Sequence, residues 1–217
     1  MNVVLEVQKS LKNISMEKRI TTGDVRSISS KLYRSIEDKN IDHVFKLCEQ
    51  LLNEREWALG VIAYDWAYRV RKQYNHHTFY IFEDWLIKYV RGWGDCDDFC
   101  THAFGELLSQ NNGLFKHIIK WTEHPSFTVR RASAVILIYP IKYNKCQNIN
   151  PLKISDALLN DGHYLVLKGY GWMLKVLSEQ EPELVYNYLK NNKLPRLSFR
   201  YALEKLDPHT KKELMKG

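Results

Sequence analysis

The pattern of apolar and polar positions along the chain is helical from end to end. Apolar residues recur three and four positions apart in segments that Gly, Pro and Asn residues separate. The first thirty residues are basic and mixed, and residues 20–26 resemble a turn and cap that lead into the first expected helix. We expect helices over residues 25–36, 42–53, 54–73, 79–90, from 95 onward, 114–121, 127–139, 151–159, 164–177, 182–189, 198–206 and 209–216. No segment keeps a strand-like alternation, so the sequence predicts an all-α protein.

A loose internal repeat indicates how these helices are arranged. Residues 131–137, 168–174 and 199–205 resemble one another and begin roughly 30 to 40 positions apart. Helical hairpins that repeat at this interval stack into a curved solenoid, whose second helices usually line the concave face. We therefore expect residues 1–217 to form a single superhelical solenoid of antiparallel helix pairs with a concave basic groove, and to be a monomer.

Composition and charge limit the function classes. The chain is 45% hydrophobic and 12% aromatic, which argues against disorder. An excess of 32 basic over 25 acidic residues gives a net charge of +7. This charge permits an anionic partner, such as nucleic acid or a membrane surface, without requiring one. No apolar run approaches the roughly 20 residues of a membrane span, and the N-terminus lacks a signal pattern, so we expect a cytoplasmic protein.

The four cysteines favour a reducing compartment, because they are scattered and form no CxxC pair. Cys96 and Cys100 would share one helix face near His102. A structural zinc site normally needs two well-spaced ligand pairs, and the second pair is missing. We therefore predict no metal.

The strongest chemical signal is the stretch Arg91-Gly92-Trp93-Gly94-Asp95-Cys96-Asp97-Asp98-Phe99-Cys100. Its glycines break the preceding helix and Asp95 is a good N-cap, which would put Asp97 and Asp98 in the first turn of the next helix. The helix dipole favours an ionised carboxylate there by about 0.3–1 kcal/mol. We therefore expect Asp97 to be an anion at neutral pH and not a general acid.

Trp93 lies four residues before Asp97, so the ring and the carboxylate can border one pocket. Acidic residues in a first turn also occur for capping alone. Asp95 and Asp98 compete with Asp97 for a catalytic role, but only Asp97 has the four-residue spacing from Trp93.

Basic residues also gather near the starts of the three repeated helices: Arg130 and Arg131, Lys168 with Lys175, and Arg200. A basic stripe that faces a groove suits a phosphate backbone. Solvated Lys and Arg are equally ordinary on a solenoid, so the stripe alone leaves both interpretations open.

Three motifs in order carry a family resemblance. They are Trp93-Gly94-Asp95-Cys96-Asp97, Phe127-Thr128-Val129-Arg130 and Gly171-Trp172. On these motifs the chain resembles the DNA alkylation repair family of HEAT-like-repeat DNA glycosylases, the AlkD-like enzymes. The similarity runs from about Arg26 to the C-terminus. The sequence departs from the family pattern at Lys175, where we expect Arg, and at Phe127, where an indole is more usual.

The resemblance implies a hydrolase of base excision repair. It would remove cationic alkylated purines such as 3-methyladenine and 7-methylguanine from duplex DNA, without a cofactor. By likeness, Asp97 would be the catalytic carboxylate, Trp93 and Trp172 would flank the deoxyribose, and Arg130 would hold a backbone phosphate. The requirements of this reaction fit the same residues. A cationic purine leaves without a general acid, and an ionised Asp can stabilise the oxocarbenium-like sugar that remains.

Two alternatives stay open. Trp172 can be a core aromatic, since Tyr170 and Met173 flank it in an apolar helix. The chain can also be a non-catalytic solenoid that binds damaged or branched nucleic acid or a protein partner. The spacing of Trp93 and Asp97 favours the enzyme, because a scaffold has no need of it.

Overall fold

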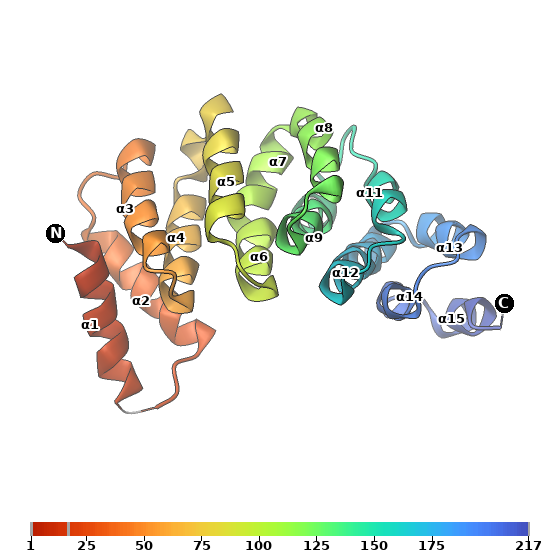
Figure 1. Cartoon of the computed structure of the whole chain (residues 1–217), viewed down its shortest axis with the longest axis horizontal. Coiled ribbons are helices and arrows are strands. Elements are labelled where there is room, and N and C mark those ends of the chain that lie inside the picture. The colour runs from red at the N-terminus through yellow and green to blue at the C-terminus, as the bar shows by residue number, and fades with distance from the viewer. Residues whose placement is uncertain (1, 17, 217) are drawn as a thin grey trace.

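The computed structural model describes residues 2–16 and 18–216, and within these residues it contains helices and no strand. Figure 1 shows helix pairs that follow one another from the N-terminal to the C-terminal end, as the predicted all-α solenoid requires. The first row of helices comprises α1 (Val3–Ser15), α3 (Ile41–Asn53), α5 (His76–Tyr89), α8 (Phe115–Ile118), α11 (Pro151–Leu158) and α13 (Pro182–Asn191). The second row comprises α2 (Thr22–Ser35), α4 (Trp57–Arg69), α6 (Trp93–Phe99), α9 (Phe127–Val135), α12 (Tyr164–Gln180) and α14 (Arg196–Leu203).

The second row is continuous, because each of its helices packs against the next from α2 to α14. Helix α7 (Gly105–Gln110) extends α6 through a π-helical turn, Cys100–Phe104. Helix α10 (Ile138–Lys142) follows α9, and α15 (Pro208–Leu214) packs on α13. Short 3₁₀ turns cover Arg71–Gln73, Asn112–Leu114 and Ile119–Glu123.

Buried aromatic side chains form the centre of the core. Trp66, Trp85, Phe82, Phe99 and Phe104 are all buried, and the Phe82 and Phe99 ring centroids lie 5.1 Å apart. Helix α4 buries residues on several sides, as the apolar pattern of residues 54–73 predicts. A rigid core of this kind holds the second-row helices in register.

The sequence prediction was wrong at three places. Residues 3–15 form α1, whose narrow apolar stripe of Val3, Val7 and Leu11 packs on the core. The expected helix over residues 127–139 is interrupted after Val135. Pro140 explains the interruption, because it has no N–H to donate to the Ile136 carbonyl and its ring crowds that oxygen.

The third error concerns the start of α6. Gly92 is the N-cap and Trp93 is the first helical residue, so Asp95 lies inside the first turn and is not the cap. Asp97 is consequently the fifth residue of α6 and lies beyond its first turn. The helix dipole therefore does not provide the stabilisation that the sequence led us to expect for Asp97.

Candidate functional site

The candidate site is built around an ion pair between Asp97 of α6 and Arg131 of α9. Arg131 Nε donates to Asp97 Oδ1 at 2.9 Å, and Arg131 Nη2 donates to Asp97 Oδ2 at 2.8 Å. Arg131 Nη1 donates to the carbonyl oxygen of Leu165 in α12. A planar guanidinium that binds both carboxylate oxygens fixes the orientation of the carboxylate. One side chain thus connects three neighbouring helices and holds Asp97 in place.

Burial and charge act in opposite directions on Asp97. Burial raises the pKa of the Asp97 carboxyl above the ordinary aspartate value of 3.8, although the hydrogen bonds and positive charge of Arg131 oppose that rise. The favourable charge next to Asp97 therefore comes from a residue distant in sequence and not from the terminus of its own helix.

Asp97 and Arg131 line a cavity of about 340 Å³ between α6, α12 and α14. Trp93 is 59% exposed and precedes Asp97 by one helical turn, so both residues lie on the same face of α6. The residues that line the cavity are Trp93, Asp97, Arg131, Tyr164, Leu165, Lys168, Trp172 and Tyr201. We call this cavity the tryptophan pocket. It brings together the predicted carboxylate and both predicted indoles.

Trp172 has a dual position. Its side chain packs partly against the hydrophobic core, as the alternative interpretation of the sequence requires, and it also lines the tryptophan pocket. Tyr164 and Tyr201 line the same pocket and were not predicted as site residues. Tyr164 is the first residue of α12, where the sequence also places the start of a helix, and this position was a signal that the sequence offered.

Two glycines in α12 make room for this arrangement. A Cβ on Gly169 would lie 3.2 Å from both Cγ and Nη1 of Arg131. A Cβ on Gly171 would lie 2.9 Å from the Ser198 carbonyl oxygen and from the Tyr201 Cβ. The Gly171-Trp172 motif therefore combines close packing of α12 on α14 with an indole that reaches the pocket.

The other two acidic candidates are separated from the tryptophan pocket. Asp98 forms ion pairs with Arg26 of α2 and, over 3.7 Å, with His102 Nδ1 if the ring is protonated. Asp95 lines a different cavity, beside Trp57 and Arg91. Of the three carboxylates in this stretch, only Asp97 lines the tryptophan pocket.

The predicted phosphate-binding residues differ in how freely their charge is presented. Arg130 Nε donates to Asp161 Oδ2 at 2.6 Å, and Arg130 Nη1 donates to the carbonyl oxygens of His124 and Pro125 at 2.9 Å. Lys175 is paired with Glu204. Lys168 Nζ lies 5.4 Å from the centroid of the Tyr164 ring, and in the part of the chain that the structure describes it has no carboxylate within ion-pair distance.

Neither a metal site nor a membrane span is found in residues 2–16 and 18–216. Cys96 and Cys100 are buried, and no group of three or more His, Cys, Asp or Glu side chains in these residues is placed to hold a metal ion. None of the helices there has the length and apolarity needed to cross a bilayer.

Comparisons with known proteins agree with the fold. A family model described as DNA alkylation repair enzyme matches residues 19–206. A predicted DNA alkylation repair enzyme from Enterococcus faecalis has a solved structure that is 16% identical, covers 87% of each chain and gives a TM-score of 0.71. AlkD2 from Streptococcus mutans is 18% identical over 94% of this chain and 99% of its own, with a TM-score of 0.67. No curated protein matches. Because the family model spans most of the chain, this protein belongs to the DNA alkylation repair enzyme family.

Proposed function

We propose that this protein is a DNA glycosylase that hydrolyses the N-glycosidic bond of cationic alkylated purines, of the 3-methyladenine and 7-methylguanine type, in duplex DNA. The observation that carries the proposal is the placement of the Asp97 carboxylate, held by Arg131, in one pocket with the indoles of Trp93 and Trp172. Membership of the repair family supports the choice of damaged DNA as substrate.

The chemistry needs a negative charge more than it needs a proton donor. A purine alkylated on a ring nitrogen already carries a positive charge, so it leaves as a neutral base and takes the electrons of the glycosidic bond with it. The sugar becomes oxocarbenium-like, and a water oxygen then bonds to C1′ and loses a proton to solvent. An oriented carboxylate next to C1′ stabilises that cation and accepts a hydrogen bond from the attacking water.

The two indoles provide a surface for the same positive charge. Trp93 and Trp172 line the pocket with Asp97, and the face of an indole attracts a nearby cation by about 0.5–2 kcal/mol. In this proposal the rings flank the deoxyribose, and Arg131 acts through Asp97 as a positioning residue. No step requires a cofactor.

Phosphate contacts are proposed for the basic residues around the pocket. Lys168 lines the pocket and has no carboxylate partner in the described residues, so it is the best placed of the four. Lys175 would have to exchange Glu204 for phosphate, and partly exposed pairs of this kind are weak enough to do so. Arg130 and Arg131 already have protein acceptors, and their contacts with DNA stay predictions.

The test is release of free methylated base from methylated duplex DNA, assayed without added metal. We expect release by the wild-type chain and none by Asp97→Asn, with duplex binding retained or slightly tighter because a charge that repels phosphate is removed. Equal release by both chains would reject the role of Asp97.

A second candidate function is non-catalytic binding of damaged or branched nucleic acid. The observation that favours it is that both oxygens of the Asp97 carboxylate are already bound by Arg131, which offsets the negative charge that the glycosylase needs. If neither chain releases base but both bind duplex, this function replaces the glycosylase.

A further inference from the structure

An unexpected regularity appears at the first residue of the second-row helices. Four consecutive helices of this row begin with an aromatic residue: Trp57 in α4, Trp93 in α6, Phe127 in α9 and Tyr164 in α12. The helices pack side by side and each follows a helix of the opposite direction, so their first residues lie along one edge of the solenoid (Figure 1). We call this row of four side chains the aromatic edge.

Two cavities lie along the aromatic edge. Trp57 lines a small cavity together with Arg91 and Asp95, which flank the start of α6. Trp93 lines the tryptophan pocket together with Tyr164. The four helix starts thus follow one another from α4 past the candidate site to α12, with Trp57 in one cavity and Trp93 and Tyr164 in the other.

Three of the four rings of the aromatic edge are exposed, whereas Phe127 is partly buried against the core. Trp57 is 46% exposed, Trp93 is 59% exposed and Tyr164 is 57% exposed. Phe127 is stacked on His163 with centroids 3.9 Å apart and an interplanar angle of 12°, and His163 is stacked in turn on Tyr164. Single exposed aromatics need no explanation, but a row at the same position of successive helices indicates a binding surface.

Cations and carboxylates both lie along the edge, and the cations include three without a carboxylate partner among the described residues. Arg55, Arg91 and Lys168 lie beside the rings, and no described residue places a carboxylate within ion-pair distance of them. Glu56 and Asp95 line the same cavity as Trp57, and within the described part of the chain their carboxylates accept hydrogen bonds only from neutral donors, the Gln8 side chain and the Arg91 backbone N–H. The cations are therefore available to an anionic partner.

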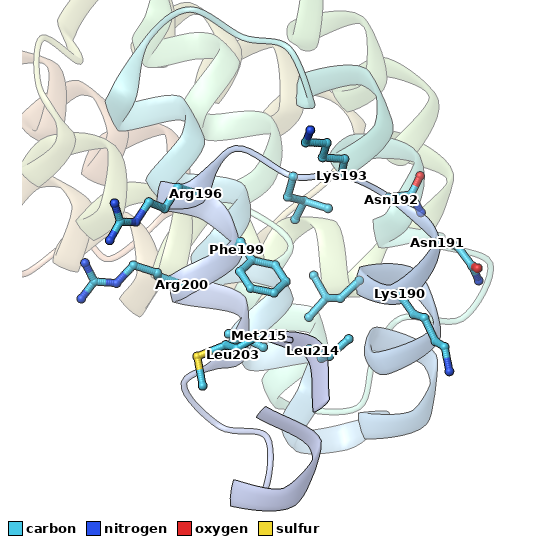
Figure 2. Close-up of a pocket in the computed structure, with 12 residues that line it drawn as sticks. Lys190, Asn191, Asn192, Lys193, Arg196, Phe199, Arg200, Leu203, Leu214 and Met215 are labelled. Carbon is cyan, nitrogen blue, oxygen red and sulfur yellow. The ribbon is translucent and has the colours of Figure 1, made fainter. Parts of the chain in front are cut away.

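The positive charge continues beyond the last ring. Helix α14 begins with Arg196 where its predecessors carry an aromatic residue. Figure 2 shows Arg196 and Arg200 projecting from the same side of α14, while Phe199 points into the neighbouring cavity. In the described residues both guanidinium groups are free of ion pairs.

We propose that the aromatic edge is a stacking surface for the unpaired bases of a single DNA strand beside the lesion. The exposed rings of Trp57 and Trp93 can meet the face of any base, and the neighbouring cations can meet its phosphates. Paired bases stack on one another and offer no free face, so the edge would distinguish opened from closed DNA. The proposal rests on the proposed function only in taking DNA as the partner.

Trp57 gives the sharpest test, because it lies outside the tryptophan pocket and is half exposed. Binding of the full chain is measured by fluorescence anisotropy with a labelled single-stranded oligothymidylate of about 12 nucleotides and with a fully paired duplex. Trp57→Ala should weaken binding to the single strand about tenfold, and it should leave duplex binding and base release from duplex unchanged. Trp57→Phe should restore most of the single-strand affinity.

A matched control is Tyr80→Ala in α5, because Tyr80 is 61% exposed and lies outside the aromatic edge. This variant should bind both probes as the wild type does, and circular dichroism checks that each variant is folded. The proposal is overturned if Trp57→Ala binds oligothymidylate like the wild type, or if it loses affinity for single strand and duplex in equal proportion. Binding of an acidic peptide in place of oligothymidylate would also overturn it.

The result is independent of the proposed function, because base release and single-strand affinity are separate measurements. A chain that fails to release base but loses single-strand affinity on Trp57→Ala would reject the glycosylase and keep the aromatic edge. The opposite pair of results would keep the glycosylase and reject the edge.

Discussion

Asp97 and Asp98 are neighbours in the chain, yet they belong to two different regions of the molecule. Asp98 lies in an ion network with Arg26 of α2 and with Asp65 and Arg69 of α4. Asp97 faces the other way, toward Arg131 of α9, and borders the tryptophan pocket. Successive residues of a helix point about 100° apart, so adjacent carboxylates can serve separate purposes.

The two regions differ in what is left for a ligand. In the network between α2, α4 and α6, two guanidinium groups pair with two carboxylates and Arg69 also donates to Ser30, although Asp98 Oδ2 is buried without a hydrogen-bond partner in the described residues. In the tryptophan pocket a single ion pair is surrounded by aromatic rings and by Lys168. Similar charged residues thus form a structural network in one region and a candidate site in the other. The predictions below test this contrast.

The largest expected effect separates the two aspartates. Asp97→Asn should lower base release by about a thousandfold or more, since it removes the charge that stabilises the sugar cation. Asp98→Asn should retain most of the release and instead lower stability, because it weakens a largely buried network. Base release and urea unfolding of both variants are the measurements. Equal losses of activity would show that the contrast is wrong.

Arg131 provides the next test. Arg131→Ala leaves a largely buried carboxylate without its partner and should cost about 3–5 kcal/mol of unfolding free energy. Arg131→Lys keeps the charge but not the planar fork, so it should recover part of the stability and less of the activity. Urea unfolding and base release check this. Full activity in Arg131→Lys would argue against a positioning role.

A pH profile tests the ionisation of Asp97. Burial raises the pKa of Asp97 above 3.8, although Arg131 opposes the rise. As the pH is lowered, Asp97 should therefore be protonated, and activity lost, at a higher pH than for an aspartate with the ordinary pKa. The effect of the same protonation on folding stability has the opposite sign. The folded chain binds the Asp97 proton more tightly than the unfolded chain, so the free energy of unfolding rises as the pH falls from the folded-state pKa to the unfolded-state pKa.

Activity at low pH would therefore fall without any loss of folding from this group. In Arg131→Lys the midpoint of the activity profile should move to higher pH, since less positive charge opposes the effect of burial. An unchanged midpoint would assign the profile to a different group.

The smallest expected effect concerns two basic residues of the predicted stripe. Lys168→Ala should weaken duplex binding for all sequences and reduce the salt dependence by about one phosphate contact. Arg130→Ala should change the salt dependence less, because its donors already bind Asp161 and two carbonyl oxygens, and should mainly lower stability. Binding measured over a range of salt concentrations decides between them. The sequence prediction for Arg130 would hold if both variants changed the slope equally.

Local spacing explains which features could be predicted. The positions of most helices follow from apolar periodicity, and the common pocket of Trp93 and Asp97 follows from a spacing of one helical turn. The N-cap of α6 was misplaced by three residues, because Asp is the more common capping residue and Asp95 was preferred to Gly92, which the structure uses. Helix α1 was missed because its apolar stripe is only three residues long.

The sequence by itself determined the all-α solenoid, the order of its helices and the pairing of an indole with a carboxylate on one helical face. Only the tertiary structure decided which charges meet. Arg131, predicted to bind phosphate, is paired with Asp97, and Arg130 is paired with Asp161. The physical reason is that helical periodicity is local, whereas an ion pair across α6, α9 and α12 depends on how separate helices pack, which periodicity does not encode.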